Sequence, residues 1–217
     1  YEHSQRTLVC IMKDGTLVSI EGIDGAGKTT VIDGTEEVNG LNTYFEDATY
    51  TTEPNDDTWL GKKVRQAISN DGPDTPPMSV FFLFLAEHAN HVEDVVKPSL
   101  EQGDTVICDR YIDSRYAYQS YEIDDLVEGD TLEWIRSIQE QKWTEVPDRT
   151  IILDLPVETA MERLDGDEIF EKSEKLQYFR QTYLRLAEKD DRYKIVDARQ
   201  SPEEVIAECR ELIEEIQ

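Results

Sequence analysis

Short apolar runs alternate with longer amphipathic segments along the chain. We predict strands where apolar residues fill or alternate through about five positions, and helices where they recur every three or four positions. The predicted strands are 17–21, 43–52, 104–108, 149–155 and 193–196. A short helix is predicted after residue 30, and longer helices are predicted at 59–68, 79–100, 130–143, 157–163, 173–188 and 202–216.

Alternating strands and helices favour an α/β fold, in which a parallel sheet carries helices on both faces. A length of 217 residues suits one such domain, and no internal repeat or low-complexity linker marks a second. We expect residues 1–11 to be an appendage to a domain spanning 12–217, because Met12 directly precedes the polar start of the first strand. The run Phe81–Leu85 is apolar on nearly every side of its helix, so it is expected to be buried.

A glycine-rich loop joins the first predicted strand to the first helix and matches the pattern G-x-x-x-x-G-K-[ST]. Its glycines allow backbone N–H groups to point into one concavity, where the helix adds the positive end of its dipole. Lys28 supplies a charge for the outer phosphates, and Thr29 supplies a hydroxyl ligand for Mg²⁺. The sequence therefore predicts a nucleoside triphosphate site made of Gly22, Ile23, Asp24, Gly25, Ala26, Gly27, Lys28, Thr29 and Thr30.

Acidic residues number 48 and basic residues 22, which gives a net charge of −26. This imbalance argues against nucleic acid and anionic membranes as partners, because both require basic surfaces. The acids are spread along the chain, as in proteins whose solvated shell is adapted to concentrated salt; an ordinary acidic protein is the alternative. Three distant cysteines form no disulfide framework, so a reducing cytoplasm is expected.

Asp109 and Arg110 follow an apolar strand directly, and ligands bind at the carboxyl ends of strands in parallel sheets. Asp109 is expected to hold Mg²⁺ directly or through water, the alternative being a cap of the next turn. Arg110 offers a fork of donors to a phosphate, the alternative being a surface ion pair. Basic residues are scarce, so those near the loop are candidates for phosphate binding: Lys28, Arg110, Arg115 and Arg163.

Three stretches together resemble the thymidylate kinase family, in a form similar to that of salt-loving archaea. They are LVSIEGIDGAGKTT, TTEP and FLFLAEHANHVEDVVKPSLEQGDTVICDRYIDSRYAYQ. The resemblance implies a P-loop NTPase fold, with a five-stranded parallel sheet, helices on both faces and a short lid. It also implies a homodimer that moves the γ-phosphate of ATP to dTMP with Mg²⁺, giving dTDP and ADP for dTTP synthesis.

The resemblance also implies roles for individual residues. Phe84 would stack on thymine, although its apolar helical run alone favours a place in the core. Tyr118 would face the deoxyribose, and Glu53-Pro54 would border the acceptor's phosphate and sugar. The implied catalytic residues are Lys28, Arg110, Asp24 and Arg163, and Thr29 with Asp109 would hold the metal. The implied acceptor-binding residues are Glu53, Pro54, Phe84, His88, Arg110, Arg115 and Tyr118.

Several positions depart from the family pattern. Thr52 stands where the family often has an arginine, and His88 replaces an arginine that helps fix the acceptor base. Arg115 stands where Ser, Thr or Asn usually reads the base; it either restores the charge lost at His88 or changes the base preference. The lid segment 164–168 is short and acidic, which leaves Arg163 as the expected cation over the phosphates.

Two other functions remain open from the sequence. One is a kinase of the same fold with a shifted or broadened acceptor, such as dUMP or dCMP, because His88 and Arg115 alter the base pocket. The other is a nucleotide-gated switch that hydrolyses its triphosphate without an acceptor. The absence of an Asn-Lys-x-Asp motif and the aromatic cluster after Asp109 both weigh against a switch.

The net charge leads to a prediction about salt. In dilute buffer we expect the purified chain to lose its compact state through self-repulsion, and in molar KCl to regain it, because a salt concentration of ~1 M shortens the screening length to ~3 Å. Circular dichroism and sedimentation across a KCl series measure this change. A chain that stays folded and monodisperse in dilute buffer would show that it is an ordinary acidic protein.

Overall fold

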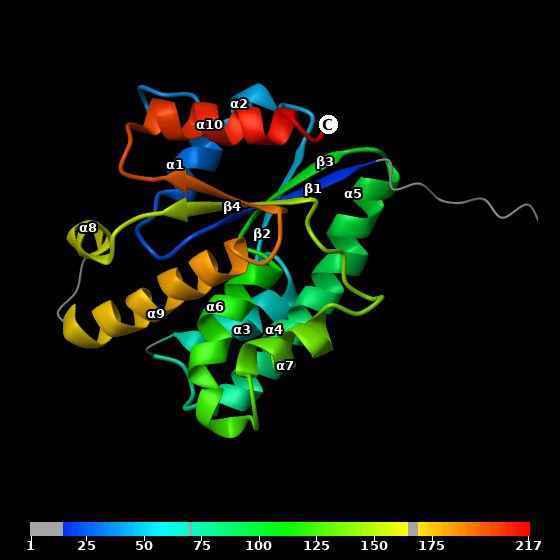
Figure 1. The fold of residues 1–217 in the computed structure, drawn as a ribbon. Coiled ribbons are helices and arrows are strands. Elements are labelled where there is room, and N and C mark those ends of the chain that lie inside the picture. The colour runs from blue at the N-terminus through cyan, green and yellow to red at the C-terminus, as the bar shows by residue number, and fades with distance from the viewer. Residues whose placement is uncertain (1–14, 70, 165–168) are drawn as a thin grey trace, which may run out of the picture.

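The computed structural model describes residues 15–69, 71–164 and 169–217, which form one five-stranded sheet with helices around it (Figure 1). All neighbouring strands pair in parallel, in the order β2-β3-β1-β4-β5. Their carboxyl ends therefore lie at one edge, as the alternation of strands and helices predicted. The strands are β1 (Thr16–Glu21), β2 (Thr49–Thr52), β3 (Thr105–Asp109), β4 (Arg149–Asp154) and β5 (Tyr193–Asp197).

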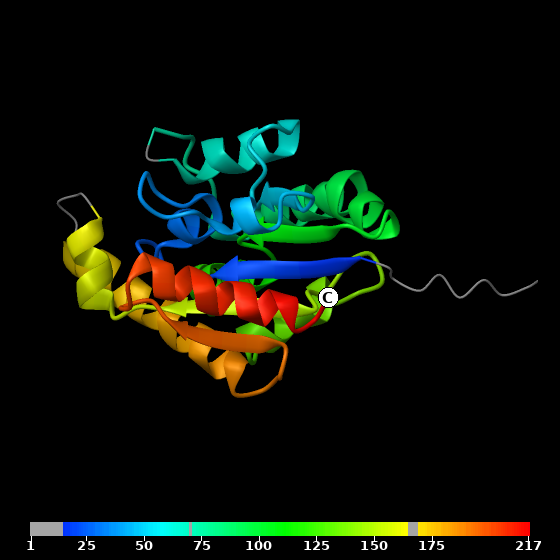
Figure 2. The ribbon, with the colours of Figure 1, turned by 90° about the horizontal axis from the view of Figure 1, so that it is seen from above.

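Helices cover both faces of the sheet, which confirms the predicted α/β class (Figures 1 and 2). One face carries α1 (Lys28–Asp33), α2 (Leu41–Tyr44) and α10 (Pro202–Glu214). The other carries α3 (Trp59–Ile68), α4 (Pro77–His91), α5 (Lys97–Glu101), α6 (Ile112–Glu122), α7 (Thr131–Gln139) and α9 (Ile169–Ala187). Helix α8 (Val157–Arg163) lies beyond the carboxyl end of β4. Among these described helices, none is long and apolar enough to cross a membrane.

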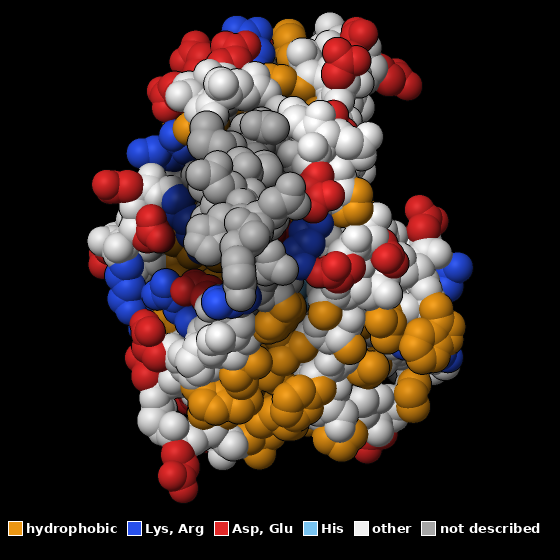
Figure 3. All heavy atoms as spheres, turned by 90° about the vertical axis from the view of Figure 1, so that its right-hand side faces the viewer, with side chains coloured by type: hydrophobic (Ala, Val, Ile, Leu, Met, Phe, Trp, Pro, Cys, Tyr) orange, Lys and Arg blue, Asp and Glu red, His pale blue; other side chains and the backbone are white. Residues whose placement is uncertain are grey.

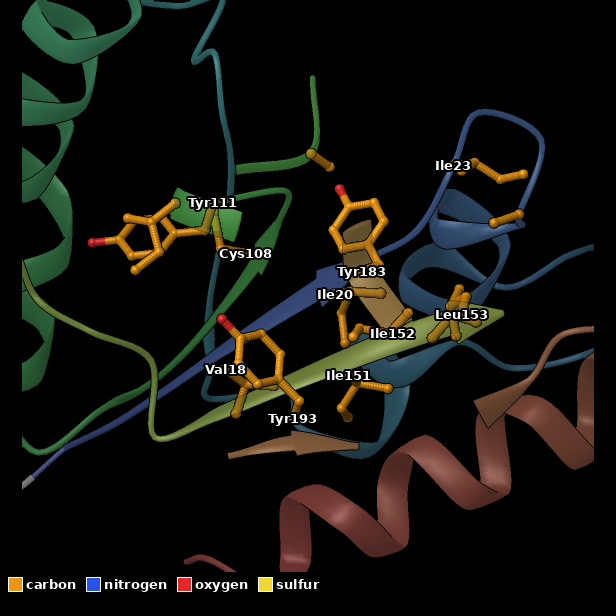
Figure 4. Packing of buried hydrophobic residues seen from close by; sticks show 14 of the residues in the cluster. Val18, Ile20, Ile23, Cys108, Tyr111, Ile151, Ile152, Leu153, Tyr183 and Tyr193 are labelled. Carbon is orange, nitrogen blue, oxygen red and sulfur yellow. The ribbon is translucent and has the colours of Figure 1, made fainter. Parts of the chain in front are cut away.

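The core lies where the three central strands meet the helices of both faces. Three apolar residues of each of β1, β3 and β4 are buried, and polar residues such as Ser19 and Thr150 are buried with them, because both faces of these strands are covered. Figure 4 shows Val18 and Ile20 of β1 and Ile151 of β4, with Tyr183 of α9 packed on the other side of the sheet. These side chains are almost fully buried, so the sheet is a rigid base for the residues at its carboxyl edge.

Several helix ends follow local capping signals in the sequence. Ser201 begins α10 with a capping box, in which its hydroxyl accepts from the N–H of Glu204 and the Glu204 carboxylate accepts from the Ser201 N–H. Thr58 caps α3 by accepting from the N–H of Gly61. Such caps satisfy N–H groups that have no partner inside the helix. The predicted helices 59–68 and 157–163 match α3 and α8 at both ends.

The predicted helix 79–100 is helical throughout but changes pitch near its end. Helix α4 passes through a π turn at Val92–Val96 into α5. Pro98 carries no N–H and its ring crowds the carbonyl of Asp94, a conflict that the wider turn relieves. The expectation that Phe81–Leu85 is buried on all sides is wrong: Phe81 is fully buried, whereas Phe82 is 53% exposed. Figure 3 shows apolar side chains gathered on the surface over α4 and its neighbours.

Two further sequence predictions differ from the structure. No helix was expected at 112–122, where α6 buries Ile112, Tyr116 and Ala117 at helical spacing. Tyrosines and a β-branched start, which favour strands, obscured this helical pattern. The predicted strand 43–52 is extended only in β2, because its first residues belong to α2. The expected appendage at 1–11 lies outside the described residues.

A buried ion pair attaches α6 to the far strands of the sheet. Asp113 accepts from both terminal nitrogens of Arg192, at 3.0 and 2.7 Å, and from the hydroxyls of Thr150 and Tyr193. Burial alone would raise the pKa of Asp113, but the Arg192 guanidinium and these hydrogen bonds hold it below its usual value. Asp113 is therefore ionised, and α6 cannot leave the sheet without separating a buried pair.

Replacing Arg192 by Met is expected to lower the free energy of unfolding by about 3–5 kcal/mol, because Asp113 would remain as a buried carboxylate without its guanidinium. In the wild type this stabilisation is present above about pH 4 and is lost as pH falls through the lowered folded-state pKa of Asp113. Urea unfolding at fixed salt measures the difference. Arg199→Met removes an exposed pair with Asp197 and is the control; equal losses in both variants would contradict a special role for the buried pair.

Candidate active site

The glycine loop predicted to hold phosphates lies between β1 and α1, at the carboxyl edge of the sheet. Gly25 and Gly27 both have positive φ angles, 83° and 98°. A Cβ on Gly25 would approach the carbonyl oxygen of Ala160 to 3.0 Å, so a side chain there would strain the loop. A Cβ on Gly27 would meet none of the described residues within 4 Å. The backbone therefore curves around open space, as an anion-binding loop requires.

Lys28 folds back over this loop. Its ammonium donates to the carbonyl oxygens of Gly22 and Ile23, both at 3.2 Å, and the residue is buried. Burial, with repulsion from Arg110, lowers the pKa of Lys28 to about 8. Its charge is therefore retained at neutral pH and is weakly shielded from anything bound in the loop.

A cavity of about 730 Å³, here called the loop cavity, opens over the glycine loop. Gly22 and Ile23 do not line the loop cavity, but their carbonyl oxygens accept hydrogen bonds from Lys28. The far wall of the loop cavity is formed by Ala198 and Gln200 beyond β5. Its lining includes seven of the predicted triphosphate-binding residues: Asp24, Gly25, Ala26, Gly27, Lys28, Thr29 and Thr30.

Thr29 and Asp109, the expected metal ligands, line the loop cavity together. The Oδ1 atom of Asp109 is buried and has no hydrogen-bond partner among the residues that the structure describes. Burial raises the pKa of Asp109, against the attraction of Lys28 and Arg110. An unpartnered carboxylate oxygen beside a hydroxyl suits Mg²⁺, which prefers few protein oxygens and keeps several waters. The residues present therefore fit a magnesium ion held between the protein and phosphates.

Arg110 occupies a left-handed turn at the end of β3, with φ of 64°. Its N–H donates to the carbonyl oxygen of Ile20, and the next N–H, of Tyr111, donates to Glu21 at 2.7 Å. The Cys108 thiol donates to the Arg110 carbonyl at 2.9 Å. A non-glycine residue in this conformation costs of order 1–3 kcal/mol, and these three contacts hold it there.

The Arg110 side chain points across the edge of the sheet toward the glycine loop. One terminal nitrogen donates to the Gly22 carbonyl at 3.3 Å and to the Ser114 hydroxyl at 3.2 Å. The other pairs with the Asp24 carboxylate, and the guanidinium lies 4.9 Å from the centre of the Tyr118 ring. Two contacts from the glycine loop and two from α6 therefore fix the guanidinium between them.

A second cavity, of about 250 Å³ and here called the adjoining cavity, opens beside the first. Asp24, Asp109 and Arg110 line both. The structure thus brings together six of the seven residues expected to bind an acceptor, with all of them on the wall of this cavity: Glu53, Pro54, Phe84, Arg110, Arg115 and Tyr118.

His88 is the exception, and its expected contact with the acceptor needs correction. The residue is fully buried and does not line the adjoining cavity. Its Nδ1 bonds Glu53 at 2.7 Å and its Nε2 bonds the Thr144 hydroxyl at 3.1 Å, so both ring nitrogens are occupied. The direction of this side chain on α4 turns it toward Glu53, away from the space that an acceptor could fill.

Glu53 is the centre of a buried polar cluster. One of its oxygens accepts from Nδ1 of both His88 and His91, each at 2.7 Å, and the other accepts from Arg115 at 2.6 Å. Burial would raise the pKa of Glu53, but Arg115 and His88 hold it well below its usual value. Burial lowers the pKa of His88 to about 4, so this histidine is neutral with its proton on Nδ1.

Sequence reasoning missed two residues near the site, of which Glu21 supports it from beneath and Arg65 lines the adjoining cavity. Glu21 is fully buried and accepts from the Ser114 and Tyr183 hydroxyls at 2.7 and 2.8 Å. Burial, with repulsion from Asp113, raises the pKa of Glu21 to about 7. The sequence held a signal for Glu21. It is a glutamate at the end of an apolar strand, directly before a glycine loop, and such a position is buried at the edge of the sheet.

Arg65 is the other missed residue. It projects from α3 into the wall of the adjoining cavity, where its Nε donates to Asp56 at 2.8 Å. Its side chain is half exposed, so a ligand could take it from Asp56 at little cost. The sequence held one signal that could have identified Arg65. Basic residues are scarce, so an arginine on the helix that follows Glu53-Pro54 is a candidate for phosphate binding.

Arg163, the expected lid cation, lies at the end of α8 and lines the loop cavity. Its terminal nitrogen donates to the carbonyl oxygen of Gly25 at 3.1 Å. The segment 165–168, which would complete the expected lid, lies outside the described residues. Arg163 therefore reaches the glycine loop from the opposite side to Arg110.

A phosphate-binding loop, a magnesium-compatible pair of ligands and an adjoining cavity that shares Arg110 define a P-loop kinase of the nucleoside monophosphate kinase class. The family model described as "Thymidylate kinase" matches residues 20–209. The match covers most of the chain, including both cavities. The chain belongs to the thymidylate kinase family.

Relatives of known name extend over nearly the same length. A protein of Methanosarcina acetivorans is 42% identical over 195 residues, covering 88% of this chain and 91% of that protein. One of Halorubrum lacusprofundi is 40% identical over 203 residues, covering 92% and 98%. One of Halobacterium salinarum is 40% identical over 194 residues, covering 89% and 92%. Each of the three is named "Probable thymidylate kinase", and two are from salt-loving archaea.

Proposed function

We propose that this protein transfers the γ-phosphate of ATP to dTMP, giving dTDP and ADP, as a step in dTTP synthesis. The observation that carries the proposal is the wall that the two cavities share. Asp24, Asp109 and Arg110 line both of them, so a triphosphate in one and a monophosphate in the other would meet there. Transfer between bound phosphates requires this closeness, because positioning supplies most of the rate in such reactions.

In this proposal the loop cavity holds ATP. The backbone of 24–28 surrounds the phosphates, and Lys28 neutralises the outer ones from its weakly shielded position. Thr29 and Asp109 hold Mg²⁺, which when bound stabilises negative charge on the phosphates. Arg163 approaches the same phosphates from α8 and helps to exclude water, so that hydrolysis of ATP does not compete.

The adjoining cavity holds the acceptor. Arg110 and Arg65 supply guanidinium donors for its phosphate, and Arg65 compensates for the missing arginine at Thr52. Phe84 offers a half-buried aromatic face for the base. Tyr118 stacks on Phe179 of α9 at 4.1 Å and faces the sugar from a fixed position. Glu53-Pro54 closes the wall behind them.

We further propose that the enzyme works as a homodimer in the cytoplasm. Phe82 of α4 and Trp59 of α3 are 53% and 71% exposed, and such apolar area commonly marks an interface. A second copy is the proposed partner, because concentrated salt screens the repulsion between two chains that each carry a net charge of −26. The same charge disfavours nucleic acid and anionic membranes. Cys108 and Cys209 are buried free thiols, which suits a reducing compartment.

Replacing Phe82 by Glu is expected to shift the protein from dimer to monomer, because a buried charge in an apolar interface is costly. Sedimentation equilibrium in molar KCl measures the mass. Leu126→Glu changes an exposed apolar residue beyond α6 and serves as the control. A wild-type protein that sediments as a monomer at micromolar concentration would rule out the proposed dimer.

The proposed reaction is tested by ADP release from ATP and Mg²⁺ in molar KCl, with dTMP, dUMP, dCMP, UMP and dGMP offered separately. We expect the strongest response to dTMP and none without Mg²⁺. Lys28→Ala is expected to lower kcat by about 100-fold or more, since it removes the main charge facing the phosphates. Lys63→Ala, an exposed lysine of α3, is the control.

Two results of this assay would contradict the proposal. A response led by dUMP or dCMP would support a kinase with a shifted acceptor, the alternative that the altered base pocket leaves open. ADP release that is independent of every acceptor would instead support a nucleotide-gated switch, for which the adjoining cavity would have no substrate.

A further inference from the structure

Glu21 ends β1 and is fully buried, and it lines neither cavity. Its Oε1 accepts from the N–H of Tyr111 at 2.7 Å. Its Oε2 accepts from the hydroxyls of Ser114 and Tyr183, at 2.7 and 2.8 Å. These three donors belong to the turn after β3, to α6 and to α9. One carboxylate therefore joins three elements at the point where the glycine loop begins.

Two of these donors also act on Arg110. The N–H of Tyr111 belongs to the peptide that follows Arg110, so Glu21 holds the left-handed turn in which φ is 64°. The Ser114 hydroxyl accepts from the Arg110 guanidinium at 3.2 Å. A hydroxyl has one proton, and since Glu21 accepts it, the lone pairs of Ser114 are left to face the guanidinium. Glu21 therefore determines the direction of both the backbone and the side chain of Arg110.

The third donor, Tyr183, connects Glu21 to a helix that is firmly attached to its neighbours. Arg180 of α9 donates to both oxygens of Asp154 at the end of β4, at 2.6 and 2.9 Å. Phe179 stacks on Tyr118 of α6, with the ring centres 4.1 Å apart. Both contacts lie within about one helical turn of Tyr183. Helix α9 therefore holds the Tyr183 hydroxyl in a fixed place relative to the sheet.

The alternative is that Glu21 serves only the stability of the fold. Burial, with repulsion from Asp113, raises the pKa of Glu21 to about 7, so the ionised carboxylate is disfavoured at this position. A glutamine would keep an oxygen for the Tyr111 N–H and would bring no charge into the sheet. Strongly perturbed carboxylates are typical of functional sites, where function is kept although stability is lowered. The charge at Glu21 is therefore better explained by its contacts to the Arg110 segment.

We infer that Glu21 is a positioning residue for phosphoryl transfer, which directs the Arg110 guanidinium toward the glycine loop and is itself held in place by Tyr183 of α9. This inference rests on the proposed function. Helix α8, which carries Arg163, also packs against α9. The two guanidinium groups that approach the phosphates from opposite sides therefore depend on the position of one helix. Such donors act through their direction, because a displacement of about 1 Å lowers the rate of transfer by about 100-fold.

The test compares the wild type with Glu21→Met and Glu21→Gln, using ATP and dTMP in molar KCl. Methionine has a similar length but accepts only weakly, whereas glutamine keeps one oxygen for the Tyr111 N–H. We expect Glu21→Met to lower kcat by about 100-fold, with KM for ATP changed less than about threefold. Glu21→Gln is expected to restore kcat to within about tenfold of the wild type.

Urea unfolding separates positioning from stability. We expect Glu21→Gln to unfold at the same or a higher urea concentration than the wild type, because the repulsion from Asp113 is removed. A lower kcat in a variant that is at least as stable is not explained by loss of the fold. A Glu21→Gln variant that unfolds well below the wild type while keeping its kcat would assign Glu21 to stability and refute the inference.

The part played by α9 is tested by Tyr183→Phe, with Tyr178→Phe as the matched control. Both tyrosines lie on α9, and each hydroxyl faces a serine of α6, at 3.1 Å for Ser114 and 3.3 Å for Ser120. We expect Tyr183→Phe to lower kcat by about 5- to 20-fold and Tyr178→Phe to change it less than about twofold. Equal values of kcat in the two variants would refute the connection from α9 to Glu21.

A double-mutant cycle shows whether Glu21 acts through Arg110. In the Arg110→Met background, we expect Glu21→Met to lower kcat by less than about twofold more. A further loss of about 100-fold in that background would show that Glu21 supports the glycine loop directly, which would refute the inference. If Glu21→Met does not fold, Glu21→Gln and Tyr183→Phe carry the same comparison.

The outcomes also separate this inference from the proposed function. A wild type that phosphorylates none of the offered acceptors would refute the proposed function, and the inference with it. A wild type that phosphorylates dTMP, together with a folded Glu21→Met variant whose kcat stays within about threefold, would refute only the role of Glu21.

Discussion

The register between β1 and β3 is the constraint on which the whole site depends. Ile20 lies directly opposite Asp109, so the glycine loop that follows β1 and the Asp109-Arg110 turn that follows β3 leave the sheet side by side. A slip of one residue would turn the strand side chains to the other face and separate the loop from its cations. Glu21 reinforces the register, because it ends β1 and accepts the N–H of Tyr111 beyond β3.

A strongly acidic chain has few cations to use inside, and several of its arginines pair with one carboxylate. Arg192 pairs with Asp113, Arg180 donates to both oxygens of Asp154, and Arg115 pairs with Glu53. Arg192 donates to Asp113 through both terminal nitrogens, and Arg180 donates to Asp154 through Nε and one terminal nitrogen, so both pairs are bidentate. Arg115 differs from them because two histidines share its carboxylate. Arg115 therefore contacts its carboxylate through one nitrogen, unlike the bidentate pairs of Arg192 and Arg180.

The sequence predicted the parts of this protein whose signals are local. The glycine loop was recognised from the spacing of its glycines, lysine and threonine, which the backbone of such a loop requires. The central strands were recognised from their short runs of apolar side chains. Helix α6 was missed because its aromatic and β-branched residues favour strands, and only packing against α9 and the sheet selects a helix. The direction of His88 and the exposure of Phe82 depend on which neighbours α4 meets. Spacing along one helix does not contain that information.

Salt acts differently on the buried polar cluster around Glu53 and on the acidic side chains at the surface. At the ionic strength of a brine the screening length is ~3 Å, so mobile ions cancel fields between exposed groups but do not enter the almost fully buried cluster. Salt can therefore change the solubility and folding of the whole chain while the contacts around Arg115 keep their strength. The geometry of this wall of the adjoining cavity is thereby insulated from the salinity of the surroundings, as long as the fold that encloses it persists.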